Sequence, residues 1–180
     1  MARWPAAAVL ATVILAQAGP AGAQQGNLEA AVKATYLYKF VPFVEWPPPA
    51  FPDASAPVKV CIAGEDPFGA VLDQAVAGQL AGGRPIELIR LERVTRPLPC
   101  HVLFAAGSAR QPVADILRAA DGEPVLTVTD GSGGPVQGII HFVIRDNRVR
   151  FEVDARAAAR NQVALSSKLL GLAVAVRQGG

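Results

Sequence analysis

The chain has 180 residues, of which 51% are hydrophobic and 18% are charged, and its formal net charge at pH 7 is +2. This balance is typical of a globular protein and excludes a disordered, strongly charged chain. The net charge also lacks the basic footprint of a nucleic-acid-binding domain, so we expect no nucleic-acid partner.

The first 23 residues have the pattern of a secretory signal peptide. Arg3 supplies a positive charge, residues 6–16 form a short apolar run, and a cleavage site of small residues ends at Ala23. The run is shorter than the roughly 20 residues that a membrane-spanning helix needs. We therefore expect export, cleavage after Ala23 and a single domain over residues 24–180. An uncleaved membrane anchor is the alternative.

The next part of the sequence predicts alternating helices and strands. Asn27 can cap a helix whose apolar residues recur every three or four positions, until the Trp46-Pro47 step ends it. Residues 47–57 are rich in proline and predict a loop. Further along, we expect strands at 58–63, 85–91, 100–106 and 124–129, and helices at 68–76 and 112–120.

The C-terminal part predicts a hairpin followed by a long helix. Strands at 138–144 and 148–153 flank a turn that contains Asp146 and Asn147, two residue types that tolerate turn dihedrals. The remaining pattern predicts one helix over 155–176. Because strands alternate with helices, we expect an α/β fold: a three-layer sandwich with a largely parallel sheet that ends in this antiparallel hairpin.

Cys61 and Cys100 are the two cysteines of the chain. An even number of cysteines in an exported protein favours a disulfide bond. Two separate buried thiols are the alternative, since free cysteine is often buried. The spacing is neither CxxC nor a zinc pattern, so redox catalysis and metal binding have little support. We expect no metal and no cofactor.

The segment GEDPFG (64–69) lies where a predicted strand passes into a helix. Open α/β sheets bind ligands at such positions, and a helix N-terminus favours anions. Gly64, Asp66 and Phe68 are therefore candidate ligand-binding residues for a small molecule. The segment lacks the further glycines of a dinucleotide-binding motif, so ordinary turn chemistry, with Asp66 as a helix cap, is the alternative.

The sequence shows no dense cluster of catalytic residues. His101 and His141 lie singly in apolar strands, where histidines are packed more often than catalytic. Ser166 and Ser167 lack a nucleophile elbow. Asp130 stands without the neighbouring carboxylates that a calcium loop needs. We therefore expect a protein that is not an enzyme.

Glu152 and Arg150 share one face of the last predicted strand, opposite Phe151 and Val153. We expect the apolar face to pack under the C-terminal helix. The charged face would then point outward, at an end of the sheet that no later strand covers. This makes Glu152 and Arg150 candidate partner-binding residues. A surface ion pair of little energetic weight is the alternative.

The stretch TYLYKFVPFVEWPPPAF (35–51) holds five of the nine Phe and Tyr residues and one of the two Trp residues. Aromatic residues at helical spacing usually form core, so we expect Tyr36, Phe40, Phe43 and Trp46 to form the buried face of the first helix. The alternative makes Trp46 a partner contact, because Trp is enriched at interfaces and here precedes a proline-rich loop.

Five sequence blocks, in order, resemble the YfiR/HmsC family of periplasmic regulators. They are VKATYLYKFVPFVEWP (32–47), VCIAGEDPFG (60–69), CHVLFAA (100–106), PVLTVTD (124–130) and GIIHFVIRDNRVRFEVDARAAARNQVALSSKLLGLA (138–173). The resemblance covers almost all of the chain after the leader. It implies that Cys61 and Cys100 take the places of a cysteine pair found in relatives. A second pair that some relatives carry near the hairpin is absent here.

The resemblance implies a non-enzymatic regulator in the periplasm. Members resemble a repressor that binds the periplasmic domain of an inner-membrane diguanylate cyclase, and so lowers cyclic di-GMP and biofilm formation. Glu152, Arg150 and Trp46 are the residues we expect at that contact. A periplasmic small-ligand sensor or solute-binding module, with its pocket at GEDPFG, is the alternative function. The sequence leaves open whether the protein forms a homodimer.

Overall fold

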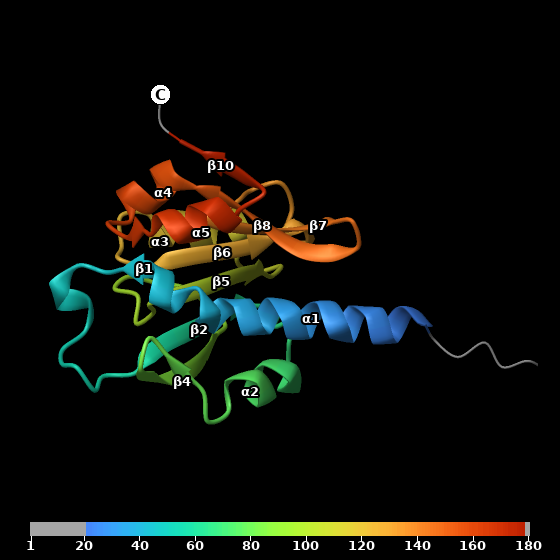
Figure 1. Ribbon diagram of the computed structural model, residues 1–180, viewed down its shortest axis with the longest axis horizontal. Coiled ribbons are helices and arrows are strands. Elements are labelled where there is room, and N and C mark those ends of the chain that lie inside the picture. The colour runs from blue at the N-terminus through green and yellow to red at the C-terminus, as the bar shows by residue number, and fades with distance from the viewer. Residues whose placement is uncertain (1–20, 179–180) are drawn as a thin grey trace, which may run out of the picture.

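The computed structural model describes residues 21–178 of the chain (Figure 1). The predicted signal peptide, residues 1–23, lies almost entirely outside this range. Within it, no helix combines the length and the apolar character needed to cross a bilayer.

A twisted sheet of eight strands forms the centre of the molecule, in the order β10-β8-β7-β6-β5-β2-β4-β3 (Figure 1). The strands are β2 (Val58–Gly64), β3 (Leu80–Ala81), β4 (Arg84–Leu91), β5 (Val102–Gly107), β6 (Leu126–Asp130), β7 (Ile140–Arg145), β8 (Arg148–Asp154) and β10 (Ala175–Arg177). Neighbours are parallel except at the β3–β4 and β7–β8 pairs. The prediction of a largely parallel sheet with an antiparallel hairpin is confirmed.

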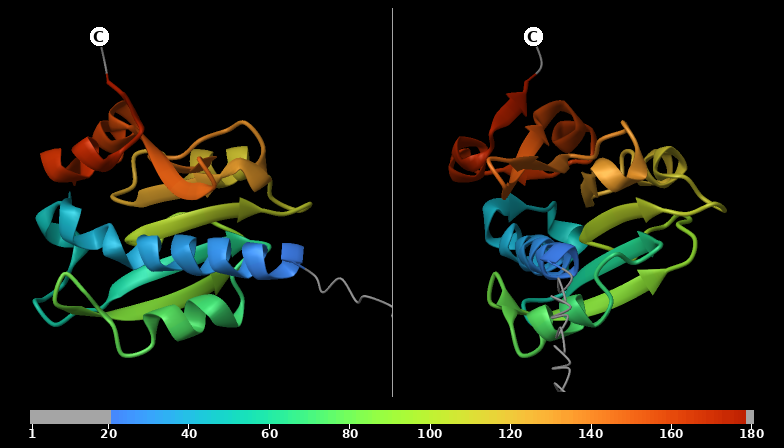
Figure 2. Two further views of the ribbon diagram at one scale, coloured as in Figure 1. Left: turned by 45° about the vertical axis from the view of Figure 1, so that its right-hand side comes forward. Right: turned by 90° about the vertical axis from the view of Figure 1, so that its right-hand side faces the viewer.

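Helices cover both faces of this sheet (Figure 2). The helices are α1 (Ala21–Lys39), α2 (Ala70–Val76), α3 (Val113–Ala120), α4 (Ala155–Arg160) and α5 (Ser167–Leu172). Side chains alternate along β2, so Val60 and Ile62 join the core under α1 and α2, whereas Cys61 and Ala63 join the core under α3. Each predicted strand, and both short predicted helices, agree with the observed elements to within two residues.

An aromatic cluster fixes α1 on the sheet. The ring centres of Phe40 and Phe151 lie 5.1 Å apart, edge to face, and those of Phe40 and Phe142 lie 6.0 Å apart. Tyr36 stacks on Phe40 at 5.5 Å. The predicted burial of the helix aromatics is thus confirmed for Phe40, which is 2% exposed. The apolar face of the last hairpin strand packs against α1, where Phe151 meets the rings of Tyr36 and Phe40. Leu169 and Leu170 of α5 belong to the same core cluster, so the expectation that a C-terminal helix covers this face holds in part.

The disulfide between Cys61 and Cys100 confirms the predicted pairing. The Cα atoms lie 5.8 Å apart, within the range that a disulfide can span. The bond joins β2 to the residues that lead into β5, where the His101 amide also donates to the Lys59 carbonyl at 2.9 Å. In the chain-entropy description, closing a loop of this size stabilises the fold by about 4 kcal/mol.

The predicted long helix over 155–176 is wrong, because the chain breaks there into four short elements. Helix α4 ends at Arg160, after which Gln162 has a left-handed backbone with φ 56°. The segment then forms β9 (Ala164–Leu165), which pairs with β1 (Val44–Glu45), followed by α5 and β10. Long-range contacts therefore override local helix propensity in this part of the sequence.

Asn161 explains the break. Its side chain is buried, accepts a hydrogen bond from the Gly122 amide at 3.0 Å, and donates one to the Val125 carbonyl at 2.9 Å. A helix that continued past Arg160 would leave the Gly122 amide and the buried Val125 carbonyl without this partner. Asn161 therefore ties the C-terminal segment to the start of β6.

We predict that Asn161→Ala lowers the free energy of unfolding by about 2 kcal/mol, because it leaves the buried Val125 carbonyl unsatisfied. Chemical denaturation of the purified protein measures this change. Gln74→Ala, on the exposed side of α2, is the matched control and should cost no more than about 0.5 kcal/mol. Equal stability of the two variants would contradict the assignment.

Candidate functional site

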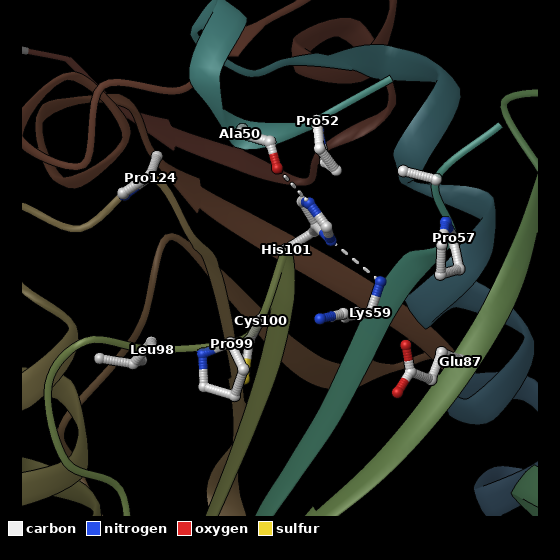
Figure 3. Close-up of a pocket in the computed structure, with 11 residues that line it drawn as sticks. Ala50, Pro52, Pro57, Lys59, Glu87, Leu98, Pro99, Cys100, His101 and Pro124 are labelled. Carbon is white, nitrogen blue, oxygen red and sulfur yellow. Dashed lines mark hydrogen bonds between the residues drawn. The ribbon is translucent and has the colours of Figure 1, made fainter. Parts of the chain in front are cut away.

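The proline-rich loop borders a cleft at the end of the sheet where β2 and β5 begin (Figure 3). The cleft has a volume of about 490 Å³, and its walls are mostly proline and alanine. Its polar side chains are Lys59, Glu87 and His101, which come from β2, β4 and the residue before β5. Cys100 of the disulfide also lines it.

His101 links the loop to β2 through the two nitrogens of its ring (Figure 3). Nδ1 accepts a hydrogen bond from the Lys59 amide at 2.9 Å, so the ring proton sits on Nε2 and is donated to the Ala50 carbonyl at 2.9 Å. The imidazole also stacks on Phe51, with ring centres 4.1 Å apart. These contacts require the neutral form of His101.

Burial lowers the pKa of His101, and the nearby positive charges of Lys59 and Arg84 lower it further. The Ala50 carbonyl acts in the opposite direction but does not outweigh them. Protonation would place a second N–H on Nδ1, facing the Lys59 amide that now donates to it. The geometry and the pKa shift therefore agree on a neutral imidazole at neutral pH.

Trp46 and Arg84 support the same loop. The Trp46 ring packs edge to face on Phe51 and His101, with ring centres 5.9 and 6.1 Å away. The Arg84 guanidinium donates to the Asp53 and Ala56 carbonyls and lies 4.1 Å from the Phe51 ring centre. Trp46 is only partly buried, and its role in partner binding stays a prediction.

The Trp46 indole N–H is buried without a hydrogen-bond partner among the described residues. Buried tryptophan normally satisfies this group, so the position is costly for the fold.

The charged face of β8 carries Arg150 and Glu152. Glu152 is partly buried, and its Oε1 lies 3.6 Å from Arg145 Nη2. The Arg150 side chain is exposed and forms no ion pair or hydrogen bond with any residue in the range 21–178, while its backbone pairs with Val143 of β7. The expectation that no later strand covers this end of the sheet is wrong, because β10 pairs with β8 and places Ala175 opposite Glu152.

The structure brings two of the three predicted partner-binding residues together. Arg150 and Glu152 are neighbours on β8, whereas Trp46 touches His101 immediately before β5. In the sheet, β7 and β6 lie between those two strands. A partner that contacts Trp46 as well as Arg150 would have to extend across them.

The predicted ligand-binding residues at GEDPFG mainly hold their own turn together. Asp66 accepts hydrogen bonds from the Phe68 and Gly69 amides at 2.8 and 3.2 Å and forms an ion pair with Arg90 at 2.7 Å. Phe68 is buried against Phe104, with ring centres 4.8 Å apart. The ligand role of these residues stays a prediction.

Gly64 marks a close approach of two strands. Its φ is +94°, and a Cβ atom at this position would lie 2.2 Å from the Gly107 carbonyl oxygen. Only glycine fits, because a side chain would collide with the backbone of β5. A cavity of about 250 Å³ lies beside it, lined mainly by the segments that follow β2 and β5. The glycine therefore serves strand packing at this site.

A buried ion pair that the sequence analysis missed joins α1 to the end of β6. Lys33 Nζ lies 2.7 Å from Asp130 Oδ2 and 2.6 Å from Glu29 Oε1. Burial lowers the pKa of Lys33, but these bonds outweigh it and hold the pKa above its usual value. Burial raises the pKa of Asp130, yet the bonds from Lys33 and Ser132 leave it below the ordinary range.

The Glu29–Lys33 spacing of four residues on a helix was the only local signal for this ion pair, since Asp130 lies 97 residues further along the chain.

Among the described residues, no group of three or more potential ligating side chains could hold a metal ion.

A profile of the YfiR/HmsC-like family matches residues 30–174. The chain belongs to this family. The match runs from α1 through α5 and includes both cysteines of the disulfide, so the resemblance of the five sequence blocks is confirmed. No curated protein matches the sequence significantly.

The YfiR/HmsC-like family consists of periplasmic regulators of cyclic di-GMP signalling, and it is regulatory rather than catalytic. The described sites agree with that character. His101, Asp66 and the Lys33–Asp130 pair have their polar partners within the protein. Clefts lie at the start of β2 and β5, beside Gly64 and around α1.

We predict that the folded protein loses stability as the pH falls below the usual histidine pKa of about 6.5. The pKa of His101 is lowered in the folded state, so the unfolded state binds the proton first and is favoured in acid. His101→Gln should lose that contribution, at most about 1.4 kcal/mol per pH unit.

Melting temperatures at pH 7.5 and pH 5 test this prediction. The difference between the two pH values should be smaller in His101→Gln than in the wild type. Burial also lowers the pKa of His141. Both proteins therefore keep part of the acid sensitivity. An unchanged difference would show that His101 does not titrate in this range.

Proposed function

We propose that this YfiR/HmsC-like protein represses an inner-membrane diguanylate cyclase by binding its periplasmic domain, and so lowers cyclic di-GMP and biofilm formation. The observation that carries the proposal is the family match over residues 30–174. The accessible charged face of β8 supports a binding role.

We place the contact on that face. Arg150 is the best suited of the candidate residues, because its side chain is exposed and has no ion-pair or hydrogen-bond partner among the described residues. Glu152 is more constrained, since it is partly buried beside Arg145, and would act by orienting that arginine. Charged groups at the rim of an interface favour association rate and specificity, which suits a regulator that must choose one partner. Trp46 would require a second contact at the proline-rich loop.

The small-ligand sensor has weaker support. Asp66 and Phe68 already have partners within the protein, and Gly64 is fixed by strand packing. A small ligand at GEDPFG would have to use the backbone or the neighbouring cavity of about 250 Å³. We therefore keep the regulator as the proposed function.

We predict that deleting the gene raises cyclic di-GMP in a cell that also expresses a periplasm-exposed cyclase. Removing the repressor frees the cyclase, and a plasmid copy should restore the wild-type level. A copy without residues 1–23 is the matched control, since it lacks the export signal and should not restore repression. Cyclic di-GMP is measured in cell extracts. An unchanged level in the deletion strain, with the cyclase expressed, would overturn the proposed function.

We also propose export with cleavage after Ala23, leaving a single domain over residues 24–180. Arg3, the apolar run and the small residues before Gln24 support this, and so does a disulfide, which oxidising compartments favour.

The mature protein from a periplasmic extract is therefore predicted to begin at Gln24. Intact-mass spectrometry measures its N-terminus. Replacing Ala21 and Ala23 together by larger residues should block cleavage and leave the longer form. Recovery of a periplasmic form that still begins at Met1 would argue for an uncleaved anchor.

A further inference from the structure

A groove of about 360 Å³ lies between α1 and the hairpin of β7 and β8. Its apolar wall comes from Leu28, Val32 and Tyr36 on α1 and from Ile144 and Val149 on the hairpin. Leu28 is 66% exposed and Ile144 is 48% exposed, although both are large hydrophobic residues. Exposed apolar side chains gathered around a groove favour burial by a partner.

The groove runs beside an open edge of the sheet. Strand β10 pairs with β8 only from Glu152 to Asp154, and the Phe151 carbonyl accepts a hydrogen bond from the Val174 amide. Backbone groups alternate in direction along a strand, so those of Val149 point to the same outer side as those of Phe151. Within residues 21–178, no strand pairs with the segment 148–150 on that side.

The rim of the groove is positively charged. Arg148 and Arg150 line it, and neither guanidinium forms an ion pair or hydrogen bond with another described residue. Glu29 also lines the groove, but its carboxylate is held by Lys33 at 2.6 Å. The groove therefore offers two unpaired guanidinium groups beside an apolar floor, a combination that complements an apolar segment with acidic residues.

We propose that this groove binds an extended segment of the partner, which adds as a strand to the edge of β8. In this arrangement the segment pairs with the backbone of Val149, inserts apolar side chains between Leu28 and Ile144, and places acidic side chains near Arg148 and Arg150. Strand addition uses main-chain bonds for affinity and side-chain pockets for specificity. The identity of the partner as the cyclase rests on the proposed function.

An extended segment suits the site better than a helix does. The unpaired backbone groups of β8 are a template for another strand, and a helix has no free amides or carbonyls along its length to meet them. Charge complementarity points to an acidic segment. A second copy of this chain is less suited, because its own matching edge would bring the same two arginines into the groove.

The test uses two pairs of variants in the deletion strain. Ile144→Asp places a negative charge in the groove, and Leu172→Asp is its control at an apolar residue of α5 that is 59% exposed and does not line the groove. Arg150→Glu reverses a rim charge, and Arg93→Glu is its control at another exposed arginine. Each variant is assayed for cyclic di-GMP, periplasmic abundance and melting temperature.

We expect both groove variants to restore less than half of the repression, while both controls repress like the wild type at similar abundance and melting temperature. A photo-crosslinking amino acid at Leu28 should also capture an epitope-tagged cyclase in the same cells, and one at Leu172 should not. If Ile144→Asp lowers the melting temperature, the result for Arg150→Glu is used to judge the proposal, since the Arg150 side chain has no ion pair or hydrogen bond to lose.

The outcomes separate this inference from the proposed function. If deletion raises cyclic di-GMP but the groove variants repress fully, the groove is not the binding site and the regulator stands. If deletion has no effect, the proposed function fails, and with it the assignment of the cyclase as occupant. If light scattering shows a wild-type dimer that Ile144→Asp converts to a monomer, the occupant is a second copy and the proposal is overturned.

Discussion

The packing of α1 against β7 and β8 is the constraint on which the rest of the structure depends. Phe40 meets Phe142 and Phe151 in one aromatic cluster, and the Lys33–Asp130 ion pair fixes the same helix to the end of β6. Apolar burial supplies most of the stabilisation, while a buried ion pair mainly fixes orientation. Because Tyr36 belongs to both the cluster and the groove wall, the position of the helix also sets the width of the groove.

Local sequence patterns predicted most of the sheet, because each buried strand is a short apolar run bounded by turn residues. The hairpin was predictable for a similar reason: Asp146 and Asn147 adopt positive φ values of 50° and 57°, which these residue types tolerate. The C-terminal segment was not predictable in this way. Its helix ends because Asn161 binds Gly122 and Val125, about forty residues earlier in the chain, and no local pattern reports that contact.

The candidate site was predictable only in part, and for a related reason. Strand alternation correctly placed Arg150 and Glu152 on one face of β8. It could not show that a strand of three residues, β10, returns to cover part of that edge, since so short a strand has no measurable periodicity. The groove was missed entirely, because it forms between residues near 30 and residues near 147 that only the folded chain brings together.

The direction of β10 has a practical consequence for attaching labels to the protein. The strand runs parallel to β8, starting opposite Glu152 and ending opposite Asp154, so the chain leaves the sheet on the side away from the segment 148–150. A fluorophore or affinity handle joined at the C-terminus therefore follows a strand that runs away from the groove. One joined at Gln24, where the proposed cleavage leaves the N-terminus, is attached to the helix that carries Leu28, a groove-lining residue. The C-terminal attachment is accordingly the one that leaves the open edge accessible.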